Sequence, residues 1–236
     1  MSTVALITAR GLFGRRRALL LLPLPLLLIA LAAICRAYDV PADQWGQAVI
    51  VGLGFAVVLP VVALIVGTGV LGSEVDDGTL VHILTKPLPR RDIILAKFLV
   101  AAVATTITTV IPLFAVGLLA GSAKLGAALS VAAAAGALAY SALFVLLSLL
   151  TRRPVLLGLV YILVWEGLLG RFLSGTRILS IEQYVITIAD TIAPTNMLTA
   201  QIGLTTALVM SVVFVVGCTV AAINRLGSFT LAGETS

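Results

Sequence analysis

Long apolar runs alternate with short polar connections along the whole chain. A helix needs about 20 apolar residues to cross the hydrocarbon core of a bilayer. The runs predict six transmembrane helices, at about 18–35, 48–71, 98–121, 126–150, 154–169 and 201–223. Because a backbone in hydrocarbon must satisfy its own hydrogen bonds, we predict an all-α membrane protein with one transmembrane domain over residues 1–236.

Three connections carry further predictions. Gly121-Ser122-Ala123-Lys124 leaves room only for a tight antiparallel hairpin between the third and fourth spans. Residues 170–200 are too polar to cross the membrane and too apolar to stay in water, which predicts short amphipathic helices at the outer surface, broken by Pro194. A plain surface loop is the alternative there. Residues 1–17 fit an interfacial helix on the inner leaflet, with disorder as the alternative.

Composition agrees with this fold class and the charges give it an orientation. Hydrophobic residues make up 61% of the chain and charged residues 11%, against about 25% charged residues in soluble domains. The net charge of +5 does not indicate nucleic-acid binding, because the cations lie beside apolar runs. With both termini cytoplasmic, the inner side holds eleven cations: Arg10, Arg15, Arg16, Arg17, Lys86, Arg90, Arg91, Lys97, Arg152, Arg153 and Arg225. The outer side then holds four: Arg36, Lys124, Arg171 and Arg177.

The spans hold few groups that do chemistry. Glu166, near the outer end of the fifth span, is the exception, and we interpret it as a wet helix end. Because buried carboxylates mark ion relays, their scarcity argues against a proton-driven or sodium-driven transporter. The sequence G-x-x-x-x-G-K-[ST] of ATP-binding loops is absent, as are metal-binding and hydrolase motifs. We therefore predict no catalytic site, metal or cofactor in this chain, and no disulfide between Cys35 and Cys218.

The polar segment 72–97 is the strongest functional signal. It holds eight of the 25 Asp, Glu, Lys and Arg residues and the sole histidine, His82. Ser73 stands three residues before Asp76, which predicts a helix beginning with a capping box. Pro87 and Pro89 would end that helix.

This predicted helix has an acidic start and one apolar face. Glu74, Asp76 and Asp77 fall in its first turn, and Leu80, Ile83 and Leu84 share one side. Such a helix suits the groove of a partner protein. The alternative is a solvated loop whose basic half pairs with lipid headgroups.

The segment resembles the connection between spans two and three in type-2 ABC exporter permeases. The resemblance is carried by Glu74-Val-Asp-Asp-Gly78-Thr79-Leu80, by Lys86-Pro87-Leu-Pro-Arg90-Arg91 and by Ile94-Leu95-Ala96-Lys97-Phe98. It implies a coupling helix seated on a separate ATP-binding cassette subunit, present in two copies, which would bind ATP and Mg. The resemblance further implies a second permease copy, as a homodimer, in a bacterial plasma membrane.

The resemblance assigns the contact with the ATPase to a set of residues on this segment. They are Glu74, Asp76, Asp77, Gly78, Thr79, Leu80, Ile83 and Leu84. Glu74 would pair with a basic group and Gly78 would allow close backbone approach. The expected function is ATP-driven export of an apolar or amphipathic substrate. Two alternatives remain open: a nonenzymatic membrane assembly or channel protein, and a metal-dependent membrane phospholipid transferase built on Asp76-Asp77-Gly78.

Overall fold

The computed structural model describes residues 21–76, 90–170 and 174–228. Every element of secondary structure within these residues is a helix, as the apolar runs predict. In chain order the elements are α3 (Pro23–Ala37), α4 (Ala42–Gly46), η1 (Gln47–Val58), α5 (Leu59–Asp76), α7 (Arg90–Leu119), α8 (Ala123–Leu150), α9 (Pro154–Val160), η2 (Tyr161–Leu169), η3 (Ser174–Leu179), α11 (Ile181–Ile192) and α12 (Leu204–Ser228). Of these, η1 and η2 are π-helices and η3 is a 3-10 helix.

Apolar helices occupy the positions of all six predicted spans. Four of them are long and apolar enough to cross a membrane: Ala42–Val70, Arg91–Leu119, Ala123–Leu150 and Leu204–Leu226. Two are shorter, Pro23–Ala37 and Pro154–Leu169. The all-helical membrane fold is therefore confirmed, whereas the count of six crossings stays a prediction.

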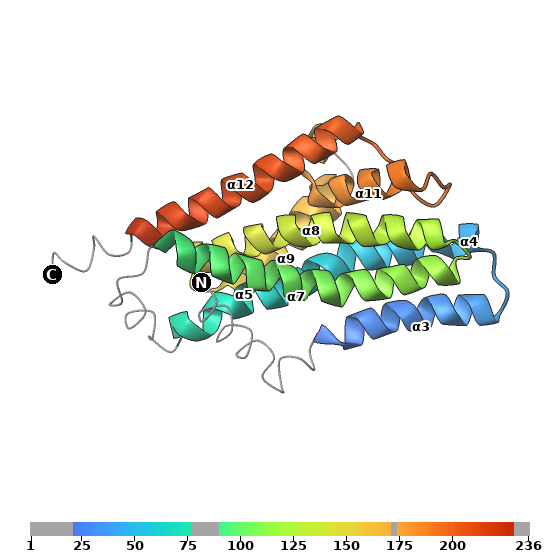
Figure 1. Ribbon diagram of the computed structural model, residues 1–236, viewed down its shortest axis with the longest axis horizontal. Coiled ribbons are helices and arrows are strands. Elements are labelled where there is room, and N and C mark those ends of the chain that lie inside the picture. Colours follow the sequence, from blue (N-terminus) through green and yellow to red (C-terminus); the bar gives the residue numbers. More distant parts are fainter. Residues whose placement is uncertain (1–20, 77–89, 171–173, 229–236) are drawn as a thin grey trace.

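The bundle is built around α8, which packs against α5, α7, α11 and α12 (Figure 1). Small residues make these contacts close. A Cβ atom added at Gly136 would lie 2.6 Å from Val185 Cγ2 and 2.7 Å from Leu59 Cδ2. The spacing Ala132-xxx-Gly136 thus serves the packing of α8 against α11 and α5.

The predicted hairpin between α7 and α8 is confirmed. Gly121 adopts a positive φ of 88°, which glycine reaches without steric cost. The N–H of Ser122 donates to the carbonyl of Gly117 at 3.2 Å and closes the end of α7. The Ser122 side chain then accepts from Leu125 N at 3.2 Å and begins α8.

Substituting Gly117 with alanine is expected to destabilise the protein by about 1–3 kcal/mol, the usual cost of overpacking. A Cβ atom there would lie 2.3 Å from Gly126 Cα, so α7 and α8 would have to separate. The matched control is Gly217→Ala on α12, where nothing lies within 4 Å of the added atom. Thermal unfolding of the two variants in detergent measures the difference, and equal melting temperatures would contradict the close packing.

The outward faces of the helices are apolar. On α7, the side chains of Leu99, Val103, Ile107 and Ile111 are 49–63% exposed and recur at every fourth position. The outward face of α12 is likewise apolar, and its side chains there are 48–61% exposed: Leu208, Val209, Val212, Val213, Val216 and Val220. Soluble monomers rarely expose apolar areas of this size, but lipid covers them in a membrane. The chain is therefore a multi-pass membrane protein.

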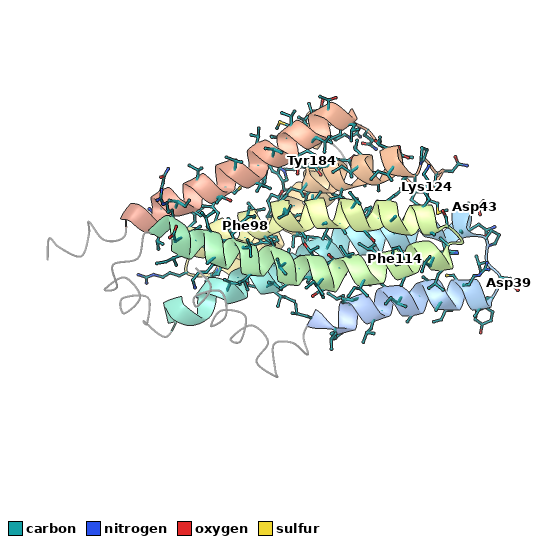
Figure 2. All side chains as sticks on the ribbon, in the orientation of Figure 1. Asp39, Asp43, Phe98, Phe114, Lys124 and Tyr184 are labelled. Carbon is teal, nitrogen blue, oxygen red and sulfur yellow. The ribbon has the colours of Figure 1, made fainter. Side chains whose placement is uncertain are left out.

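The connections fall at two ends of the bundle. The last turn of α5, the first turn of α7 and the end of α12 lie together at the left of Figure 1. Asp39, Asp43 and Lys124 lie at the opposite end, beside the α7–α8 hairpin (Figure 2). The polar segment 72–97 thus leaves and re-enters the bundle at the same end.

The described part of the segment between the fifth and sixth predicted spans contains two helices, η3 and α11. α11 ends before Pro194, as the sequence predicts. Most of its side chains are buried, and the helix packs along α8 and α12. The apolar face of α11 packs on the bundle, as expected of an amphipathic helix, and its position at the outer surface of the membrane stays a prediction.

Candidate functional site

The structure describes only the beginning of the predicted coupling segment. Glu74 and Asp76 belong to the last turn of α5. Asp77, Gly78, Thr79, Leu80, Ile83 and Leu84 fall in 77–89, outside the described residues. The predicted helix start at Ser73 is wrong, since α5 continues without a break through Asp76. In an unbroken helix the N–H groups after Ser73 bond to the preceding turn and need no cap.

Lys97 links α7 to the end of α5. Its side chain is only 1% exposed, and its Nζ donates to the carbonyl oxygen of Val70 at 3.0 Å. Val70 stands six residues before the end of α5. The bond therefore joins the two helices that carry the polar segment, close to where that segment leaves the bundle. The sequence predicts Lys97 just before the third span, but no local pattern predicts its burial.

Glu166 lies at the centre of a buried hydrogen-bond cluster, with 2% of its side chain exposed. Its Oε1 accepts from Tyr140 Oη at 3.2 Å, from Tyr161 Oη at 3.0 Å and from the backbone N of Ile181 at 3.0 Å. Its Oε2 accepts from the Ser180 hydroxyl. Four donors therefore meet one carboxyl group, and the interpretation of Glu166 as a wet helix end is wrong.

The Glu166 cluster joins three elements far apart in the sequence. Tyr140 belongs to α8, Tyr161 to η2, and Ser180 is the N-cap of α11. Phe144 extends the contact, because its ring stacks on Tyr140 at a centroid distance of 6.0 Å and meets the edge of Tyr161 at 6.4 Å. Since buried polar networks fix one arrangement when every member is satisfied, this cluster sets the position of α11 on α8.

Further hydrogen bonds hold η3 against its neighbours. Trp165 Nε1 donates to the carbonyl of Leu179 at 3.3 Å, and Thr176 Oγ1 donates to that of Leu169 at 2.8 Å.

Burial of the Tyr184 hydroxyl, followed by the nearby charge of Glu166, raises the pKa of Tyr184 to about 12. Tyr184 therefore stays protonated and donates to the carbonyl of Ile178. The connection from η2 to α11 is thus fixed over its described length.

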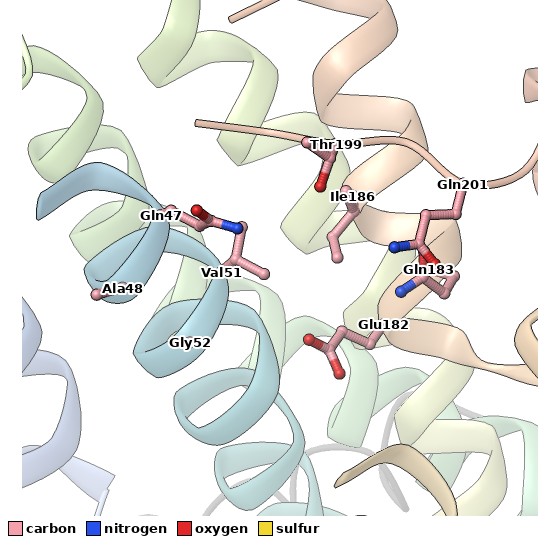
Figure 3. Close-up of a pocket in the computed structure, with 9 residues that line it drawn as sticks. All are labelled: Gln47, Ala48, Val51, Gly52, Glu182, Gln183, Ile186, Thr199 and Gln201. Carbon is pink, nitrogen blue, oxygen red and sulfur yellow. The ribbon is translucent and has the colours of Figure 1, made fainter. Parts of the chain in front are cut away.

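A polar pocket of about 320 Å³ opens between η1, α11 and the connection to α12 (Figure 3). Its lining comprises Gln47, Ala48, Val51, Gly52, Glu182, Gln183, Ile186, Thr199 and Gln201. In Figure 3 the carboxyl group of Glu182 points from α11 into the gap towards η1. No local sequence pattern predicts this pocket, because its lining comes from three separate segments.

The described residues contain neither a metal-binding cluster nor a disulfide. The part of the chain that the structure describes brings no three His, Cys, Asp or Glu side chains together as a metal site. Cys35 and Cys218 are both free thiols in this structure. The fold is a helical bundle with lipid-facing sides and polar groups at its two ends, which defines an integral membrane protein of the all-helical class.

Comparison with known proteins identifies the family. The model of a family described as ABC-2 family transporter protein matches residues 15–176. The chain therefore belongs to the ABC-2 family of transporter proteins, in agreement with the resemblance of its polar segment to permeases of this type. None of the curated proteins searched matches the chain. Family membership favours a transporter over a phospholipid transferase.

Proposed function

We propose that this chain is the transmembrane permease subunit of an ATP-driven exporter. Permeases of this family normally work with an ATP-binding subunit. The sequence contains no ATP-binding loop of its own. ATP and Mg would thus be bound by a separate subunit, in two copies, and this chain would convert the motion of that subunit into transport.

The proposal rests on how α5 and α7 meet. The end of α5 and the start of α7, which the polar segment 72–97 connects, lie at one end of the bundle. There Lys97 on α7 donates a hydrogen bond to the carbonyl of Val70 on α5. A force applied to the segment would act on both helices together. The positive-inside rule supports a cytoplasmic position for this end, because eleven of the 15 cations fall on that side. Both termini would then be cytoplasmic as well, in a bacterial plasma membrane.

An apolar cavity supports an apolar or amphipathic substrate. It measures about 230 Å³ and lies between the second and fifth predicted spans. Its lining contains no charged side chain and consists of Gly52, Ala56, Val57, Val61, Leu159, Ile162, Leu163 and Gly167. The path would lie at the contact between two permease copies in a homodimer, surrounded by membrane lipid.

The coupling assignment is tested with Glu74→Lys and Gly78→Trp in the complex of this chain with the ATP-binding subunit that co-purifies with it in detergent. Charge reversal at Glu74 would repel the basic group expected on the ATPase, and the indole at Gly78 would block close approach. We expect each substitution to lower ATPase stimulation at least about tenfold, a coupling loss of ~1.4 kcal/mol. The permease should still insert into the membrane.

Asp43→Lys is the matched control, since it reverses an acid at the opposite end of the bundle. It should leave ATPase stimulation unchanged. Parental activity in both coupling variants would overturn the assignment. If no ATPase subunit is captured with the permease in detergent, a nonenzymatic assembly or channel protein becomes the better account.

A further inference from the structure

Two cavities border the same side of η1. The polar pocket of about 320 Å³ lies along the first part of this helix, the apolar cavity of about 230 Å³ continues beyond it, and Gly52 lines both. Ala48, Gly52, Val57 and Val61 line these cavities at steps of four or five positions. Such steps keep residues on one face of a π-helix, whose hydrogen bonds join residues five apart. The two cavities therefore form one groove, which we call the η1 groove.

The η1 groove changes from polar to apolar along its length. At its polar end Gln47, Thr199 and Gln201 are exposed, and Figure 3 shows Gln47 and Gln201 on opposite sides of the gap. At its other end every lining residue is apolar. Leu163, which is 68% exposed, borders that end, so the groove is open there to the hydrocarbon of the bilayer. A molecule lying along the groove would place hydrogen-bonding groups at one end and a hydrocarbon chain at the other.

Two glycines keep the groove open without serving the packing of helices. Cβ atoms added at Gly52 and Gly167 would meet only the backbone of their own helices, at 4.0 Å and 3.5 Å. At Gly158, by contrast, a Cβ atom would lie 2.2 Å from Leu64 Cδ1, so the contact of α9 with α5 requires glycine there. Glycine inside a helix costs about 0.5–1 kcal/mol relative to alanine. At Gly52 and Gly167 no neighbouring helix requires this cost, and a side chain at either position would occupy the groove.

The lining of the polar end favours an uncharged head. It includes no Lys, Arg or His, so a phosphate or carboxylate head would find no cation among these residues. Glu182 is the only charged residue of the lining, and it already interacts within the protein, so it offers no free charge to a cation. Amide and hydroxyl groups both donate and accept hydrogen bonds. A head with several hydroxyl groups matches them.

We propose that the η1 groove binds a single-chain amphiphile with an uncharged polyhydroxyl head, of which a monoacylglycerol is the simplest example. The head hydroxyls hydrogen-bond with the exposed groups of Gln47, Thr199 and Gln201. The hydrocarbon chain passes over Gly52 and lies against Leu163. The inference rests on the proposed function in taking this molecule as the exported substrate, and it narrows the substrate class. The head lies towards the α4 end of the bundle, where Gln47 begins η1, and that end faces outward in the orientation proposed above.

The experiment uses the purified full-length permease in nanodiscs, without an ATPase subunit, and a monooctanoylglycerol that carries a diazirine at the end of its chain. After irradiation, mass spectrometry maps the labelled peptides with and without excess unlabelled 1-monooctanoylglycerol. We expect the excess to lower the labelling of residues 154–169 at least about tenfold, while labelling of the lipid-facing α12 stays unchanged. Octanoate has the same chain and an anionic head, and without the head hydrogen bonds it should compete at least about tenfold less well.

Matched substitutions test the position of the molecule. Gly52→Leu fills the groove where its two ends meet and should remove the labelling that the excess compound lowers. The helix should be kept, because leucine favours a helix more than glycine does, and thermal unfolding verifies this. The control is Gly217→Leu on α12, where nothing lies within 4 Å of the added Cβ atom, and it should label like the parent. Gln201→Leu should weaken competition by 1-monooctanoylglycerol roughly 2–10-fold, the effect of one neutral hydrogen bond.

Three results would overturn the proposal: labelling of residues 154–169 that the excess does not lower, equal labelling of the Gly52→Leu and Gly217→Leu proteins, or equal competition by octanoate. Because no ATPase is present, any of these results leaves the coupling assignment standing. Conversely, parental ATPase stimulation in Glu74→Lys and Gly78→Trp would leave the binding result standing.

Discussion

Replacing Glu166 with leucine is expected to lower the free energy of unfolding by at least about 3 kcal/mol. The substitution leaves the hydroxyls of Tyr140, Tyr161 and Ser180 and the backbone N–H of Ile181 without their acceptor. Each buried donor that stays unsatisfied costs about 1–3 kcal/mol. α11 should lose its fixed position on α8, so that proteases cleave the connection between η2 and α11 faster. Thermal unfolding and limited proteolysis of the full-length chain in detergent measure both effects.

Two milder variants calibrate this result. Glu166→Gln keeps an acceptor oxygen and should destabilise less than Glu166→Leu. Tyr161→Phe removes one donor and leaves the carboxyl group satisfied by its other partners, so its expected cost is only about 0.5–1.5 kcal/mol. If all three variants unfold at the parental temperature, the cluster does not hold the bundle together.

Replacing Lys97 with methionine is expected to reduce ATPase stimulation and transport by roughly 5–150-fold while the fold survives. Methionine has a similar volume, and the exchange also removes the cost of keeping an ammonium group out of water, so we expect the fold to survive. The exchange removes the hydrogen bond from Lys97 Nζ to Val70 that joins α7 to α5. Coupling free energies between two sites are typically ~1–3 kcal/mol, which sets the expected range.

Arg91→Met is the control for this variant. Arg91 is a cation on the same helix, but its side chain is 74% exposed and pairs only weakly with Asp92, at 3.9 Å. Exposed pairs of this kind contribute little. Arg91→Met should therefore retain ATPase stimulation. If the Lys97→Met protein folds and still stimulates the ATPase as strongly as the parent, the hydrogen bond from Lys97 to Val70 has no part in coupling.

Much of the architecture follows from the sequence because membrane spans are local features. Each apolar run must form its own backbone hydrogen bonds in lipid, so helix positions can be predicted without knowing the neighbours. The α7–α8 hairpin was predictable for the same reason, since Gly121 and Ser122 act within a few residues. The start of a separate helix at Ser73 was wrongly predicted, because a capping pattern matters only where a helix begins, and α5 continues through it.

The sequence by itself thus determined the membrane class and the order of the helices. Only the tertiary structure decided that Glu166 and Lys97 are buried and satisfied, and that Glu182 and Gln183 line a pocket with Gln47. The physical reason is that a polar side chain's environment depends on helices distant in the sequence. Tyr140 lies 26 residues from Glu166, and Val70 lies 27 residues from Lys97, so no local sequence pattern predicts either contact.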